Sequence, residues 1–454
     1  MKAIKNILSI CSVALLLGSC QADLLETKPY GNVAAGNMWT SENFADKGVT
    51  AIYSTLRKSY VGLGLYQMDC LGVSTDCRDA DYPIMRNTIT TSNGMFSSYW
   101  SEHYSGISRA NDAIVHLPEV DMPENKKARY MAEAKVLRAY FYYKLNIMYK
   151  GVPVYLEPVE ASECTKGQET EAAVWQVIED DLTAAINEPN LPNIYTEGSS
   201  DYGRVTKGLA YALRGKAYLY QKEYAKAAAD FEAVSQCGFG LFEGDYKQLF
   251  KEANEQSKEM IFSVQCIGLD GLGNDISFRY GTRSSFGSCW NTYLVNADFV
   301  ETYENADGSK FNWNDYIPGY NEMEPAARAV FFLRDGLTDA EKEAMKTAGA
   351  DMSKYLPEGN EARIKAAYAN RDPRLTASII TPYSTYDGAN GSNEYTYTLR
   401  WPFRAGDVSE PFDLKTDTNN RFYYLYRKFV AEGASEIPNR SYSPIDVPLI
   451  RYAD

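Results

Sequence analysis

The sequence predicts a mainly α-helical protein: a tetratricopeptide-like helical superhelix with an irregular, loop-rich ligand face and a few short strands. Segment 124–155 supports this because its apolar residues recur three or four positions apart, which gives an apolar stripe along a helix. Segment 206–234 has the residue offsets of a tetratricopeptide helix pair. Beyond residue 250 the helical periodicity fades, and Gly, Ser, Asn and aromatic residues become frequent. The stripe in segment 124–155 consists of Ala134, Leu137, Phe141, Leu145 and Met148.

Residues 1–19 are predicted to be a signal peptide. Lys2 and Lys5 precede an apolar run, Ile7 to Leu17, that is too short to span a bilayer. The run leads into Leu17-Gly18-Ser19-Cys20, which resembles a bacterial lipobox, so Cys20 is the predicted lipidation site. Several acyl chains would make such an anchor effectively permanent. Residues 20–40 are therefore expected to form a lipid anchor and tether.

Region 41–250 is predicted to be helical, with helices at 41–60, 99–117, 124–150 and 170–187 before the tetratricopeptide-like pair. Gly151 and Pro153 end the third helix, because Pro cannot continue a helix. In the pair, Gly215, Tyr218, Ala227 and Phe231 occupy the tetratricopeptide offsets, at which small residues let two helices approach and aromatics fill the gap. One such unit cannot bury its own face, so the other helices are its expected partners.

Region 251–454 is predicted to be loop-rich. Met260–Val264 is a short apolar run typical of a buried strand, and Thr338 with Glu341 forms a capping box for a helix ending near Thr347. A further helix is expected at 361–369. Segments 395–403 and 422–429 alternate enough to be strands, expected in one small sheet.

The helix at 124–150 also carries a resemblance. Glu133, the run Leu137-Arg138-Ala139-Tyr140, and Tyr149, Gly151 and Pro153 resemble the signature helix of the SusD/RagB family, and Asp372-Pro373-Arg374-Leu375 resembles a further block of it. The resemblance implies a nutrient-capturing lipoprotein on the outer membrane of Bacteroidetes, exposed at the cell surface. Arg138 is expected to bond within the scaffold. Residues 448–454 resemble the entrance to another long helix, so the chain is expected to be truncated at its end.

Several classes of protein are disfavoured. A net charge of −14 argues against binding nucleic acid, which requires a basic surface. The sequence has no P-loop, no G-x-S-x-G and no dinucleotide-binding glycine motif, so no enzyme activity and no catalytic residue is predicted. With two histidines and no C-x-x-C, neither a metal site nor a cofactor is expected. Cys70 and Cys77 are candidates for a disulfide, which an even number of cysteines does not establish.

The composition favours ligand binding. The chain has 36 Tyr, 18 Phe and 6 Trp, and flat aromatic faces flanked by polar groups suit sugars. Two stretches have this character: 75–82, whose Thr-Asp pair matches one seen in starch-binding relatives of the family, and 280–293. The predicted ligand-binding residues are Asp76, Arg78, Tyr82, Trp290 and Tyr293.

The predicted function is therefore to bind an oligosaccharide or polysaccharide at the cell surface and deliver it to a SusC-type TonB-dependent outer-membrane transporter. The resemblance supplies the transporter partner and the outer membrane. A peptide-binding, RagB-like receptor is one alternative. A lipid-anchored glycosidase is another, since it needs only two suitably spaced carboxylates.

Overall fold

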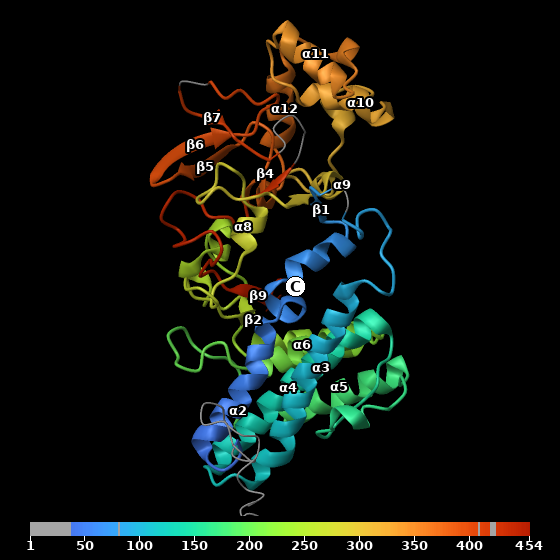
Figure 1. Ribbon diagram of the computed structural model, residues 1–454, viewed down its shortest axis with the longest axis vertical. Coiled ribbons are helices and arrows are strands. Elements are labelled where there is room, and N and C mark those ends of the chain that lie inside the picture. The colour runs from blue at the N-terminus through green and yellow to red at the C-terminus, as the bar shows by residue number, and fades with distance from the viewer. Residues whose placement is uncertain (1–37, 80–81, 407–408, 418–423) are drawn as a thin grey trace, which may run out of the picture.

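The computed structural model describes residues 38–79, 82–406, 409–417 and 424–454. The predicted signal peptide, Cys20 and most of the predicted tether lie outside these residues. The first part of the chain is helical and the later part is dominated by loops, short helices and short strands (Figure 1). None of the helices within the described ranges is both long and apolar enough to cross a bilayer.

Six helices build the first part, and the four single helices predicted from the sequence are confirmed with shifts at their ends. The second begins earlier than predicted, because the Asn93 side chain accepts a hydrogen bond from the Met95 N–H and so caps the helix there. The helices are α2 (Glu42–Ser54), α3 (Gly94–His116), α4 (Glu124–Tyr149), α5 (Glu171–Ile186), α6 (Lys207–Tyr220) and α7 (Tyr224–Gln236).

Helix α4 is the centre of this part and is buried on several sides by α2, α3, α5 and α6 (Figure 1). Arg138 on α4 is 6% exposed. Its guanidinium donates to both carboxylate oxygens of Asp181 on α5 at 2.7 and 2.8 Å, and to Asn111 Oδ1 on α3 at 2.8 Å. The prediction that Arg138 bonds within the scaffold is confirmed.

Helices α6 and α7 form the predicted tetratricopeptide-like pair. A Cβ atom at Gly215 would lie 2.5 Å from the Phe231 ring, so the glycine is what allows α6 to approach this ring of α7. The pair packs through α6 against α5. The mainly α-helical, tetratricopeptide-like fold class is thereby confirmed.

The later part contains short helices and most of the strands, and the described strands form four small sheets; β1 lies in the first part and pairs with β3 of the later part. Helix α11 has the predicted capping box, with the Thr338 side chain accepting from the Glu341 N–H and Glu341 accepting in return. The helices are α8 (Ile276–Tyr280), α9 (Ala297–Glu301), α10 (Pro325–Arg328), α11 (Asp339–Thr347), α12 (Asn360–Ala369) and α13 (Pro373–Ser378). The strands are β1 (Thr75–Cys77), β2 (Met260–Val264), β3 (Tyr293–Val295), β4 (Ile379–Ile380), β5 (Thr385–Asn390), β6 (Asn393–Thr398), β7 (Phe412–Asp413), β8 (Leu425–Tyr426) and β9 (Val447–Arg451).

Two expectations for this part are wrong. Residues 447–451 form the strand β9, antiparallel to β2, rather than the first turn of a helix. Segments 395–403 and 422–429 do not share a sheet: β6 pairs with β5 and β7, whereas β8 pairs with β4. The alternation of apolar and polar residues correctly indicated strands in both segments. Which strands pair with each other, however, depends on residues far away in the sequence.

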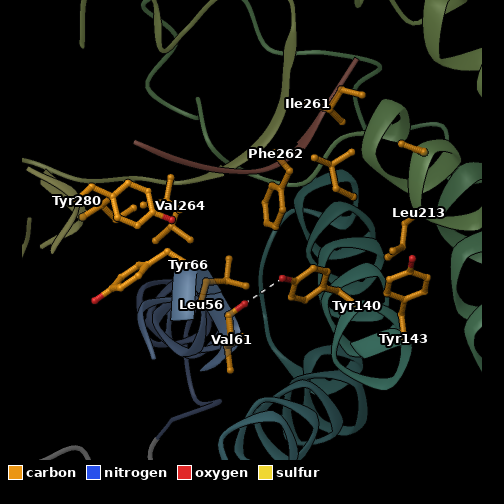
Figure 2. Close-up of a cluster of buried hydrophobic side chains, with 14 of the residues drawn as sticks. Leu56, Val61, Tyr66, Tyr140, Tyr143, Leu213, Ile261, Phe262, Val264 and Tyr280 are labelled. Carbon is orange, nitrogen blue, oxygen red and sulfur yellow. Dashed lines mark hydrogen bonds between the residues drawn. The ribbon is translucent and has the colours of Figure 1, made fainter. Parts of the chain in front are cut away.

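The two parts of the chain share one hydrophobic core. Figure 2 shows Tyr140 of α4 beside Phe262 of β2, with ring centroids 6.3 Å apart, and Leu56 and Val61 near Val264. The Tyr140 hydroxyl donates to the Val61 carbonyl oxygen at 3.0 Å, which satisfies its polar tip inside the core. This packing fixes the loop-rich part on the helical scaffold.

Candidate functional site

The two stretches predicted to bind ligand lie side by side. Strand β1 pairs antiparallel with β3, in a register that places Asp76 opposite Leu294 and Cys77 opposite Tyr293. The Arg78 N–H donates to the Thr292 carbonyl oxygen at 2.9 Å and extends the pairing by one bond. Residues 75–79, Tyr82 and 290–293 therefore form one surface, which we call the paired-loop surface.

Arg78 connects the elements of this surface. Its guanidinium donates to the Trp290 carbonyl oxygen at 2.6 Å and to Asp79 Oδ1 at 2.9 and 3.0 Å. It also forms an ion pair with Asp417, which pairs with Arg283 as well. With its donors committed in this way, Arg78 holds the loops in place.

Asp76 is half-buried. Burial raises the pKa of its carboxyl group, and the Asn296 side chain, donating at 3.3 Å, opposes that rise. The carboxylate keeps unused acceptor capacity, because two oxygens offer about four lone-pair positions. Asp76 can therefore accept hydrogen bonds from hydroxyl groups at the edge of the surface.

Tyr293 and Tyr82 differ in exposure. Tyr293 is 7% exposed and packs edge-on against Tyr66, Tyr280 and Tyr82, with ring centroids 5.3 to 6.4 Å apart. Tyr82 is half-buried and covers the outer side of this cluster. Tyr293 thus supports the surface from beneath, and Tyr82 forms part of it.

Trp290 offers the open aromatic face of the paired-loop surface. It is 40% exposed, and its ring packs on Phe278 of α8 at a centroid distance of 4.8 Å. The Arg440 guanidinium lies 4.7 Å from the centre of the Phe278 ring and donates to the carbonyl oxygens of Gly287 and Ser288 at 2.7 and 2.9 Å. Trp290 is therefore held on a rigid base.

Four residues that build this surface carry no signal in the sequence pattern: Phe278, Asn296, Asp417 and Arg440. They come from four separate segments, and only the tertiary structure brings them together. Asn291 lay within a predicted stretch, but its role is local. Its Oδ1 accepts from the Asp417 N–H at 3.1 Å and holds that carboxylate near the loop.

Cys70 and Cys77, the candidates for a disulfide, are both free thiols, and Cys77 lies on β1. Over the described ranges, no three His, Cys, Asp or Glu side chains are grouped as metal ligands would be. His103 is buried, and burial lowers its pKa to about 3, so its ring is neutral in the helical core.

Comparisons with known proteins agree with this architecture. The family model described as "SusD family" matches residues 258–454, and the one described as "Starch-binding associating with outer membrane" matches residues 25–219. A SusD-like protein of Bacteroides ovatus is 24% identical over 338 residues, which are 69% of this chain and 60% of that protein's length. This chain thus matches less than two thirds of that relative.

Two solved structures from Bacteroides fragilis have the same fold. One, a SusD-like protein, has a TM-score of 0.68 and 20% identity, covering 94% of this chain and 76% of the other. The second, titled a SusD-like carbohydrate binding protein, has a TM-score of 0.67 and 23% identity, covering 92% and 72%. With two models that together match most of the sequence, the chain belongs to the SusD/RagB family, as the signature helix around Arg138 predicted.

Proposed function

We propose that this protein is an outer-membrane glycan receptor whose paired-loop surface binds an oligosaccharide or polysaccharide and which passes that ligand to a SusC-type TonB-dependent transporter. The observation that carries the proposal is the 40% exposed Trp290 ring, which packs on Phe278 while the Arg78 guanidinium holds the Trp290 carbonyl oxygen. Sugars present C–H faces ringed by hydroxyls, and an exposed, fixed aromatic ring is the surface that such a face requires.

The relatives give the proposal its ligand class. One solved structure with this fold is titled a carbohydrate binding protein, and one matching family model is described as starch-binding. A peptide is the competing ligand. Trp290 favours sugar over an extended peptide, because sugar recognition uses a ring face, whereas peptide strand addition uses an open sheet edge.

In this proposal each residue of the paired-loop surface has one role. Trp290 stacks on a sugar ring, Asp76 and Tyr82 form hydrogen bonds with hydroxyls, and Arg78 and Tyr293 hold the loops. No bond is made or broken in the ligand, so no catalytic residue is assigned.

Binding is tested with a lipid-free chain that begins after Cys20, screened against glycan and peptide arrays and then measured by calorimetry. Trp290→Ala should weaken glycan binding by about 1–3 kcal/mol, roughly tenfold or more, by analogy with base stacking on aromatic side chains. Tyr224→Ala is the matched control, because Tyr224 is 62% exposed but lies on α7 of the helical scaffold. A glycan that binds Trp290→Ala as tightly as wild type would contradict the assigned site, and peptide binding alone would favour the RagB-like alternative.

The membrane part of the proposal rests on the lipobox. Cys20 receives the lipid and residues 21–40 form the tether. Cys20→Ala should leave the protein unlipidated and absent from the outer-membrane fraction. Wild-type fractionation of the variant, with no lipid detected by mass spectrometry, would contradict the anchor. Co-purification with a TonB-dependent transporter tests the partner.

A further inference from the structure

A cavity lies against the loop 283–288, which precedes Trp290 in the sequence. Its volume is about 730 Å³, and its walls are the loop 283–288, strands β5 and β6, the segment 403–405 and the segment 412–415. We call it the hairpin cavity, after the β5–β6 hairpin. It is separate from the five residues predicted to bind ligand, since none of them lines it.

The cavity has an aromatic wall. Tyr395 and Tyr397 lie two positions apart on β6, so they project from the same face of the sheet. Phe412 of β7 is the pairing partner of Tyr397, and its ring centroid lies 5.6 Å from that of Tyr395 and 6.3 Å from that of Tyr397. All three side chains are half-buried and keep part of their surface open. The wall offers ring faces and edges to the C–H groups of a sugar.

The lining of the cavity carries more cationic than anionic side chains, in a chain whose net charge is −14. Among the described lining residues, Arg283, Arg404 and Lys415 are cationic and one residue, Asp413, is a carboxylate. Asp413 is fully committed, because Arg334 and Arg400 both form ion pairs with it and the Arg404 N–H donates to it at 2.8 Å.

The three cations differ in how they are compensated. Arg404 donates to both carboxylate oxygens of Glu341, at 2.7 and 2.8 Å, and Arg283 shares Asp417 with Arg78. The Lys415 side chain forms no ion pair with any described carboxylate. Its backbone is fixed, since the Lys415 N–H donates to Ser284 Oγ at 2.9 Å and its carbonyl oxygen accepts from the Arg283 N–H at 3.0 Å. Lys415 therefore provides an uncompensated charge on a fixed backbone.

The hairpin cavity is close to the paired-loop surface. Phe286, in the cavity wall, and Trp290 are four residues apart, so their Cα atoms are separated by at most about 14 Å. Arg283, in the cavity, and Arg78, on the surface, are joined through Asp417. A single glycan chain is long enough to contact both regions.

We propose that the hairpin cavity is a second glycan subsite that takes a negatively charged sugar, bearing a carboxylate or a sulfate, from the same polysaccharide that lies on Trp290. This inference rests on the proposed glycan-binding function. Lys415 and Arg283 pair with the anionic group, and Tyr395 and Tyr397 contact the sugar ring. A neutral glycan uses only the Trp290 region, so the cavity sets a preference for acidic polysaccharides.

The test compares three probes by calorimetry on the lipid-free chain: oligogalacturonides, the same fragments with their carboxyl groups reduced to alcohols, and chondroitin sulfate oligosaccharides. At least one anionic probe should bind about tenfold more tightly than the reduced fragment, as expected for a hydrogen bond to a charged group. This difference should shrink in high salt. Binding of the oligogalacturonides indicates that the cavity takes a carboxylate, whereas binding of chondroitin sulfate, which carries both groups, indicates a sulfate when its desulfated form does not bind.

Lys415→Gln should remove most of the preference for the anionic probe and leave binding of the reduced fragment unchanged. Tyr395→Ala should weaken binding of the anionic probe and likewise leave binding of the reduced fragment unchanged. Lys346→Gln is the control, since Lys346 is 68% exposed on α11 and outside the cavity. Circular dichroism and thermal unfolding confirm that the variants fold.

The outcomes separate the two proposals. Equal affinity for the anionic and reduced fragments, or an anionic preference that survives Lys415→Gln, overturns the acidic subsite. If Trp290-dependent binding of a neutral glycan remains, the receptor function stands without it. If no glycan on the array or among the three probes binds, both proposals are wrong.

Discussion

Arg78 and Trp290 are 212 positions apart in the sequence and are joined by a hydrogen bond of 2.6 Å, from the Arg78 guanidinium to the Trp290 carbonyl oxygen. The bond fixes the loop that presents the Trp290 ring, while the ring itself stays 40% exposed. In the proposed receptor, Arg78 therefore acts on ligand binding through the position of Trp290.

Arg78→Ala is expected to weaken glycan binding about tenfold by releasing the Trp290 loop, since a hydrogen bond from a charged donor is lost. Arg78→Lys should not restore binding, because a lysine cannot reproduce the fork of donors that contacts Trp290, Asp79 and Asp417. Hydrogen exchange of segment 286–292 should accelerate in both variants. Arg374→Ala, at a 63% exposed arginine on α13, is the control. Unchanged exchange together with unchanged affinity would show that Arg78 does not position the loop.

Gly106 on α3 is expected to be intolerant of alanine. A Cβ atom there would lie 2.4 Å from the Phe141 ring of α4, which is fully buried and cannot move aside. The overlap should cost about 1–3 kcal/mol, more than the gain in helix propensity of at most about 1 kcal/mol. Gly94→Ala in the same helix has open space around its Cβ position and is the matched control. Urea unfolding should show a lower free energy of unfolding for Gly106→Ala only; equal values for both variants would refute the contact.

The Arg138–Asp181 pair is expected to be essential to the scaffold. Arg138→Ala leaves Asp181, which is 5% exposed, as an unpaired buried carboxylate, so the free energy of unfolding should fall by about 3–5 kcal/mol. Arg138→Met combined with Asp181→Leu should cost less than the sum of the two single replacements. Lys127→Ala, which removes a surface pair with Glu124, should change stability by at most about 1 kcal/mol. Additive losses in the double variant would show that the two residues are not coupled.

Asp446 is expected to make stability depend on pH. Burial raises the pKa of its carboxyl group to about 8, and the negative charge of Glu255 adds to the rise. The folded state therefore keeps a proton that the unfolded chain releases near pH 4, so the free energy of unfolding should decrease as pH rises from about 4 to about 8.

Asp446→Asn should flatten this pH dependence. In the wild-type chain, the Cys266 N–H donates to an Asp446 carboxylate oxygen at 2.7 Å. The asparagine oxygen can still accept this hydrogen bond, while the asparagine side chain stays uncharged at every pH. Glu343→Gln, on the exposed surface of α11, should keep the wild-type slope. Urea unfolding at a series of pH values measures how the free energy of unfolding depends on pH. If Asp446→Asn shows the same dependence as the wild type, another group is responsible for it.

The sequence by itself determined the helical scaffold. Periodicity located α2 to α5, residue offsets located the α6–α7 pair, and the Thr338 capping box located the start of α11, because each of these signals is carried by neighbouring residues. The signature residues around Arg138 also indicated the family, and aromatic composition selected the two stretches that meet at the paired-loop surface.

The tertiary structure decided the rest. Composition could not give the pairing of β1 with β3, the choice of β9 rather than a helix at 447–451, or the convergence of Arg78 and Arg283 on Asp417. It also could not separate the exposed ring of Trp290 from the buried ring of Tyr293, three residues later. Trp290 lies in the loop before β3 and Tyr293 is the first residue of that strand, and their exposure depends on Tyr66 and Phe278, which come from other segments of the chain. Strand pairing and exposure are set by contacts between distant segments, which local pattern does not record.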